Sequence, residues 1–123
     1  MNILVAGGTG YIGSHTIVEL LANGHNVSVV DNLANSSMGV ISRIKKLSGK
    51  KPKLYVFDLC DKEATNNLFK KNSFDAVIHF AGLKAVGDSV QIPLTYYDNN
   101  LLSTISLLNA MLNNGVNKLI FSS

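Results

Sequence analysis

The sequence is poor in cysteine and in long apolar runs, and each shortage excludes a class of protein. Its single cysteine, Cys60, cannot form a disulfide within the chain or pair with a second cysteine in a metal or redox site, so we expect a small buried hydrophobic residue. The longest apolar stretches fall well short of the roughly 20 residues that cross a membrane. The first residues show neither a positively charged leader nor a cleavage site, and a cytoplasmic location is therefore expected.

Charge is also scarce, at 15% of residues against 46% hydrophobic ones, which suits a globular protein and argues against long disorder. Most of the basic excess behind the net charge of +3 falls in one stretch, which holds Arg43, Lys45, Lys46, Lys50, Lys51 and Lys53. This stretch lacks interleaved aromatic residues and sustained amphipathic length. We therefore expect a solvated face there, with no nucleic-acid and no membrane partner.

Short apolar runs alternate with longer segments of helical period, and the breaks between them carry turn residues. This is the layout of βαβ units in one α/β domain of 123 residues, without a repeat or a linker. The runs are rich in Val, Ile, Leu and Phe, which is typical of parallel strands covered on both faces. Five strands are predicted, over Ile3–Ala6, Asn26–Val30, Leu54–Phe57, Ala76–Phe80 and Lys118–Ser122.

Turn and capping residues predict where the helices begin and end. The first helix is expected from about Tyr11 to Asn23, with Gly24 ending it. Asp61 is a good N-cap for a later helix.

The longest predicted helix begins near Pro93 and stops before Gly115. One apolar stripe along it consists of Tyr97, Leu101, Ile105, Leu108 and Leu112. Leu102, Leu107 and Met111 add more apolar surface than packing on one side of a sheet requires. Something besides the sheet is therefore expected to cover this helix.

A glycine-rich segment, Gly7-Gly8-Thr9-Gly10-Tyr11-Ile12-Gly13, joins the first predicted strand to the first helix. Gly7, Gly10 and Gly13 suit a tight turn off the strand, a close approach of pyrophosphate to the backbone, and a close contact of helix and sheet. The pyrophosphate would meet free amides at the positive end of the helix. A glycine pattern alone is weak evidence, but its position between strand and helix strengthens it.

Asp31 follows Gly13 by 18 residues and stands at the end of the second predicted strand. Its carboxylate can accept hydrogen bonds from the adenosine ribose and would repel a 2′-phosphate, which favours NAD over NADP. The alternative interpretation of Asp31 is a helix cap or a turn aspartate. The sequence thus predicts a Rossmann-type, doubly wound parallel sheet with strand order 3-2-1-4-5 and helices on both faces.

Further motifs resemble one family in the extended short-chain dehydrogenase/reductase group, the UDP-galactose 4-epimerases, also called UDP-glucose 4-epimerases. The motifs are Ile12-Gly13-Ser14-His15-Thr16, Asp31-Asn32-Leu33, His79 to Ser89, Tyr96-Tyr97-Asp98-Asn99-Asn100 and Phe121-Ser122-Ser123. The resemblance covers essentially the whole chain. Related nucleotide-sugar dehydratases share the glycine segment but do not usually carry Gly82-Leu83-Lys84-Ala85-Val86. Ser103 departs from the family, which commonly has glycine there.

The resemblance implies a set of NAD-binding residues in addition to the glycines. It implies that Tyr11 and Ile12 lie against the phosphates, and that Asp31, Asn32, Asn35 and Ser36 surround the adenosine ribose and phosphate. Asp58 and Leu59 would flank the adenine. The nicotinamide half would be lined by Phe80, Ala81, Gly82 and Lys84, with Asn99 and Ser122 completing the pocket.

Without the resemblance, several of these residues have plainer interpretations. Asp58 would cap a turn, Asn99 would lie on a helix surface, and Lys84 would be a solvated lysine. His79 has no acidic or cysteine partner at ligand spacing, so we expect a hydrogen-bonded core imidazole and no metal site.

The family reaction, as the resemblance implies it, removes a hydride from C4 of the hexose of a UDP-sugar and returns it to the other face. Its base is a tyrosine with a lysine four residues later, and no tyrosine here has that partner: Tyr11, Tyr55, Tyr96 and Tyr97 all lack it. We therefore assign no catalytic residue and expect residues 1–123 to form an NAD-binding domain, incomplete at its C-terminal edge and inactive alone.

The resemblance also implies that the complete enzyme is a homodimer through the helix at about 94–113 and takes a UDP-sugar as its substrate. Two alternatives remain open: a stand-alone nucleotide-binding or interaction module derived from an epimerase, and a fragment of a related dehydratase.

Overall fold

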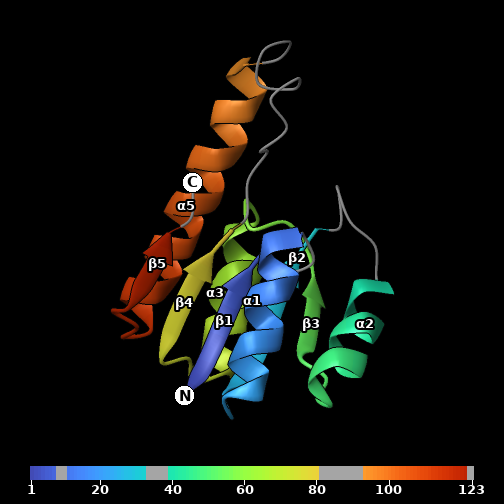
Figure 1. Ribbon diagram of the computed structural model, residues 1–123. Helices are drawn as coiled ribbons and strands as arrows, with labels where there is room; N and C mark the ends of the chain where they lie inside the picture. The colour runs from blue at the N-terminus through green and yellow to red at the C-terminus, as the bar shows by residue number, and fades with distance from the viewer. Residues whose placement is uncertain (8–10, 33–38, 81–92, 122–123) are drawn as a thin grey trace.

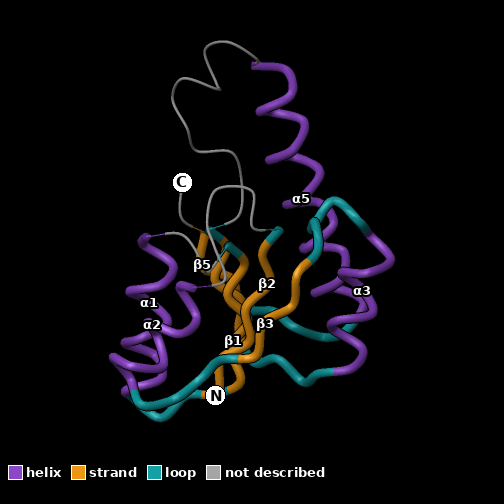
Figure 2. Tube along the Cα trace, turned by 90° about the vertical axis from the view of Figure 1, so that its right-hand side faces the viewer, coloured by secondary structure: helices purple, strands orange, loops and turns teal. Residues whose placement is uncertain are grey.

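The computed structural model describes residues 1–7, 11–32, 39–80 and 93–121, and it describes residues 11–12 and 93–100 by their backbone alone. A parallel sheet lies between two pairs of helices, α1 and α2 on one face and α3 and α5 on the other (Figures 1 and 2). The elements are β1 (Asn2–Ala6), α1 (Tyr11–Ala22), β2 (Asn26–Asp31), α2 (Gly39–Ser48), β3 (Lys53–Val56), α3 (Lys62–Lys71), β4 (Ala76–His79), α5 (Pro93–Asn113) and β5 (Leu119–Phe121).

The sheet has the order β3-β2-β1-β4-β5, and its strands are all parallel, so the predicted fold class and strand order are confirmed. The strand ends differ from prediction by at most one residue. Pairing ends at Val56, which lies opposite Asp31, and at His79, which lies opposite Phe121. Strand limits depend on the ladder that neighbouring strands form, whereas the prediction followed apolar content, which continues through Phe57 and Phe80.

Both faces of the sheet are buried, as the apolar strands predict. Along β1, Ile3 and Val5 belong to the core cluster under α1 and α2, whereas Leu4 and Ala6 belong to the cluster under α3 and α5. This alternation follows from the two-residue period of a strand. The central strand is thus held rigidly between two cores, and its carboxyl end has a fixed position.

The residues predicted to end the first helix and to cap a later one, Gly24 and Asp61, do so in the structure. Gly24 has a φ of 85°, and its amide donates to the Leu21 carbonyl at 3.1 Å, so α1 ends after Ala22. Asp61 caps α3, because its Oδ1 accepts a hydrogen bond from the Ala64 amide at 3.0 Å.

Helix α5 runs antiparallel to the strands, and its amino-terminal part rises beyond their carboxyl ends (Figures 1 and 2). Its inner face buries Leu107, Ala110 and Met111. Five further apolar residues among the described side chains of this helix form an outer stripe in which each is 39% to 79% exposed: Leu101, Leu102, Ile105, Leu108 and Leu112. Of the three residues that the sequence placed beyond the regular stripe, Leu107 and Met111 face the sheet, whereas Leu102 faces outward. The described residues of the regular stripe also face outward.

None of the helices in the described part of the chain is long and apolar enough to cross a membrane. The cytoplasmic location stays a prediction.

Candidate nucleotide site at the carboxyl edge of the sheet

The carboxyl ends of the strands meet at one edge, because all the strands are parallel. Ala6 at the end of β1 lies beside Val30 of β2 on one side and His79 of β4 on the other. From β1 the chain proceeds toward β2 and β3, whereas from β4 it proceeds to β5 on the opposite side. The winding direction thus reverses between β1 and β4, and such a switch point is where open α/β sheets bind ligands.

Gly7 makes the turn that leaves β1. Its φ is 82°, a conformation that residues with a Cβ rarely adopt, and its amide donates to the Val30 carbonyl at 2.8 Å. Helix α1 then begins at Tyr11, and Gly13 in its first turn is buried. The amino end of a helix carries a partial positive charge and is suited to bind an anion. Gly10 lies outside the described residues.

Asp31 is the last residue of β2 and is half-buried. The bond from Gly7 to the Val30 carbonyl brings the glycine turn beside the end of β2, so Asp31 follows directly after the contact. Asn32, the next residue, is exposed. An acid at this place, next to the amino end of α1, has the arrangement that binds a ribose near a pyrophosphate.

Asp58 organises the turn between β3 and α3. Its Oδ1 accepts a hydrogen bond from the Cys60 amide at 2.9 Å, and its carbonyl accepts from the Asp61 amide at 2.9 Å. The interpretation of Asp58 as a turn cap is therefore confirmed, and its exposed side chain still lies at the carboxyl edge.

Leu59 is only 4% exposed and belongs to the core under α3 and α5, so its side chain has little surface left for an adenine ring. Its carbonyl accepts a hydrogen bond from Thr65 Oγ1 at 3.1 Å. Contact of Leu59 with adenine remains a prediction and would involve mainly its backbone.

Cys60 is half-buried rather than fully buried, and it interacts with Asp58. Burial, and then the hydrogen bond and negative charge of Asp58, raise the pKa of its thiol from 9.0 to about 11. The turn interpretation of Asp58 predicts a contact two residues later, but it does not predict how far the fold buries the thiol.

Phe80 and His79 mark the end of β4 at the switch point. The Phe80 amide donates to the Ala6 carbonyl at 2.6 Å, and its half-buried ring packs against the core under α1 and α2. His79 is 1% exposed, and its Nε2 lies 3.2 Å from Thr104 Oγ1. The expected hydrogen-bonded core imidazole is confirmed.

The structure thus brings Gly7, Asp31, Asn32, Asp58 and Phe80 to one edge of the sheet. Seven further predicted residues lie outside the described part of the chain: Gly10, Asn35, Ser36, Ala81, Gly82, Lys84 and Ser122. Tyr11, Ile12 and Asn99 lie in helices whose side chains are not described there. Among the described residues, no group of three or more His, Cys, Asp or Glu could hold a metal ion.

The basic stretch lies at the opposite edge of the sheet. Lys45 and Lys46 occupy the last turn of α2, and Lys53 begins β3. All six basic residues of the stretch are exposed, as expected for a solvated face. Cations at a helix carboxyl end are also stabilised by its dipole, so Lys45 and Lys46 need no ligand to explain them.

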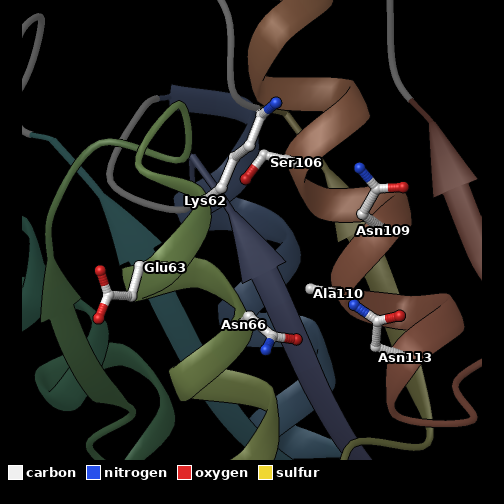
Figure 3. Close-up of a pocket in the computed structure, with 7 residues that line it drawn as sticks. All are labelled: Lys62, Glu63, Asn66, Ser106, Asn109, Ala110 and Asn113. Atoms are coloured by element: carbon white, nitrogen blue, oxygen red, sulfur yellow. The ribbon is translucent and has the colours of Figure 1, made fainter.

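A hollow of about 320 Å³ lies between α3 and α5 (Figure 3). It is lined by Lys62, Glu63, Asn66, Ser106, Asn109, Ala110 and Asn113. The Ser106 hydroxyl is buried and has no hydrogen-bond partner within the described chain. None of the predicted cofactor residues lines this hollow.

Comparison with known proteins gives one consistent family. Residues 3–123 match the model of the NAD dependent epimerase/dehydratase family. The chain is 56% identical to the UDP-glucose 4-epimerase of Bacillus subtilis over all 123 residues, which is 36% of that relative. It thus spans about a third of the length of such relatives.

Solved structures agree with this family. The UDP-glucose 4-epimerase of Bifidobacterium longum, in complex with NAD+ and UDP, superposes with a TM-score of 0.97 at 49% identity, over 100% of this chain and 37% of that one. The UDP-glucose 4-epimerase of Stenotrophomonas maltophila, with bound NAD and formylated UDP-arabinopyranose, gives 0.96 at 48% identity, over the same shares.

Proposed function

The chain belongs to the NAD dependent epimerase/dehydratase family, and we propose that the carboxyl edge of its sheet binds NAD. The observation that carries this proposal is the contact between the Gly7 amide and the Val30 carbonyl, directly before Asp31. It sets a positive-φ turn and the amino end of α1 beside a carboxylate at the end of the neighbouring strand.

Each part of this arrangement suits one part of the cofactor. The Gly7 turn and the first amides of α1 would bind the pyrophosphate, which is an anion. Asp31 would accept hydrogen bonds from the adenosine ribose, and its charge would repel the 2′-phosphate of NADP. Asn32, Asn35 and Ser36 would complete this half, and Asp58 and Leu59 would lie at the adenine.

The nicotinamide half is proposed to lie over the end of β4. Phe80 is fixed there by its bond to Ala6, and the residues proposed to follow it around the ring are Ala81, Gly82, Lys84, Asn99 and Ser122. The position of Phe80 at the switch point, across from the glycine turn, supports this half.

We further propose that this site serves the interconversion of UDP-glucose and UDP-galactose in a longer polypeptide. When bound, NAD would supply the hydride acceptor for the sugar C4 and the source of its return. These residues would hold the cofactor, and a base would come from outside them, because no tyrosine here has a lysine four residues later. The UDP-sugar is likewise a proposed substrate of that longer protein.

A second copy of the chain is the proposed partner of the outer stripe of α5. Five large apolar side chains on one helix, each at least 39% exposed, form a surface that water solvates poorly. A self-complementary helix face is typical of a symmetric dimer.

Calorimetric titration of the chain with NAD and with NADP tests the cofactor proposal. We expect saturable binding of NAD and much weaker binding of NADP. Preference for NADP, or no binding of either, would refute it.

An assay with UDP-galactose and NAD tests the proposal that the catalytic base comes from outside these residues. We expect no turnover by this chain alone, and formation of UDP-glucose would refute that proposal.

A further inference from the structure

His79 connects three elements at the switch point. Its backbone lies in register with Ala6 of β1 and with Phe121 of β5. Its ring contacts the Phe121 ring edge to face, with 5.1 Å between centroids and 89° between planes. Its Nε2 lies 3.2 Å from Thr104 Oγ1 on α5.

The alternation of side chains along β4 explains this direction. Val77 belongs to the core under α3 and α5, and Ile78 to the core on the other face. His79 therefore points toward α5, two residues after Val77. A nearly fully buried imidazole on this face requires a polar partner, and Thr104 is one.

The contacts of α5 change in character along its length. Toward its carboxyl end, Leu107, Ala110 and Met111 are buried apolar residues. At Thr104 the helix meets the sheet through a hydrogen bond, and its amino-terminal part then projects beyond the strands (Figure 2). Apolar contacts tolerate sliding and rotation, whereas a hydrogen bond depends steeply on distance and angle.

Resting on the proposed NAD site, we infer that the His79–Thr104 hydrogen bond positions the nicotinamide half of that site without touching the cofactor. His79 immediately precedes Phe80, whose amide is bound to Ala6. Asn99, the other proposed nicotinamide residue on α5, lies five residues before Thr104 in the projecting part. The bond thus fixes the two sides of one subsite relative to each other.

A small change in the tilt of α5 at Thr104 produces a larger displacement at the amino end of the helix. Five residues of helix measure about 7.5 Å, so a tilt of about 10° at Thr104 would displace Asn99 by roughly 1 Å. The adenine half is proposed to depend on Asp31 and Asp58, which lie at the end of β2 and after β3, on other elements than this bond. Loss of the bond should therefore weaken contacts to one half of the cofactor only.

The test compares NAD with ADP, which lacks the nicotinamide half. The chain is titrated with both ligands in unaltered form and as Thr104→Val, which keeps the side-chain shape and removes the hydroxyl. We expect Thr104→Val to raise the Kd for NAD roughly fivefold to tenfold, the usual effect of one hydrogen bond, and to leave the Kd for ADP unchanged. Thr104→Ser, which keeps the hydroxyl, should restore most of the NAD affinity.

Met111→Ala is the matched control for stability, because it removes buried volume from the same helix far from the bond. It should lower the melting temperature at least as much as Thr104→Val without separating NAD from ADP. Equal losses for both ligands in Thr104→Val, or no loss for NAD, would overturn the positioning role while NAD binding stands. Failure of the unaltered chain to bind NAD would overturn the role and the proposed function together.

Discussion

Gly7 occupies the conformation on which the proposed phosphate turn depends. With a φ of 82°, it tolerates no side chain without strain of about 1–2 kcal/mol. Gly7→Ala should therefore lower the free energy of unfolding by about that amount and also weaken NAD binding, because the turn would relax away from β2. Denaturant titration and calorimetry measure the two effects.

Gly49 provides the control, because its φ is 77° and an added Cβ would meet no atom within 4 Å. Gly49→Ala carries similar backbone strain but lies after α2, away from the carboxyl edge. It should lose stability and keep NAD affinity. Equal weakening of NAD binding in both variants would show that strain, not the site, causes the loss.

Asp31 carries the proposed choice of cofactor. Asp31→Asn removes the charge and keeps the shape, so the Kd for NAD should rise about tenfold or more, as expected for a hydrogen bond to a charged group. The Kd for NADP should fall or stay constant, because the repulsion of the 2′-phosphate is gone. Calorimetry with both cofactors measures this, and an unchanged ratio of the two Kd values would contradict the role of Asp31.

The Cys60 thiol should react slowly at neutral pH. Its pKa is raised to about 11, so the neutral thiol persists over the range where an ordinary cysteine becomes a thiolate. The rate of alkylation by iodoacetamide should rise with pH toward a midpoint near 11 rather than 9. Asp58→Asn removes the negative charge and should move the midpoint downward, and a midpoint near 9 in the unaltered chain would refute the contact.

At this scale, sequence predicts residues whose role is local. The positive φ of Gly24 and the cap of Asp61 follow from the chain's immediate neighbours. The pair of His79 with Thr104 depends on how a helix is placed against the sheet, so no spacing rule reveals it.

At the scale of elements, α5 shows what periodicity can and cannot predict. Its length follows from Pro93 and Gly115, but apolar residues lie on two faces, and spacing alone does not decide which one meets the sheet. In the structure, Leu107, Ala110 and Met111 pack in the core that contains Val77, and the longer stripe stays outside.

The outer stripe leads to a prediction about association. The double variant Leu108→Lys and Leu112→Lys should weaken self-association of the chain at least tenfold, because two charges would have to be buried in an apolar interface. Sedimentation velocity over a concentration series measures this. Leu47→Lys is the control, since Leu47 is 71% exposed on α2 and should leave association unchanged.

If the unaltered chain is monomeric at high concentration, or if Leu47→Lys has the same effect, the outer stripe is not the contact between copies.

The strands are predicted more completely from the sequence than the faces of this helix. Their apolar runs predict five strands correctly, and the errors of one residue arise where the pairing of neighbouring strands and the apolar run do not end together.

At the scale of the whole molecule, order and direction of strands follow from the alternation of strands and helices and place the switch point between β1 and β4. The switch point then predicts where a ligand binds, independently of any single side chain. The reaction on the sugar cannot be derived from these residues in the same way. The chain spans 36% of a relative such as the Bacillus subtilis enzyme, and it contains no tyrosine with a lysine four residues later.

The central claim is the place at which NAD binds, and amide chemical shifts in ¹⁵N-labelled chain during NAD titration test it most directly. We predict saturating shifts at Gly7, Asp31, Asp58 and Phe80, with none along the basic edge around Lys45 and Lys53. Saturating shifts confined to the hollow lined by Asn66, Ser106 and Asn109, or no shifts at all, would contradict the account.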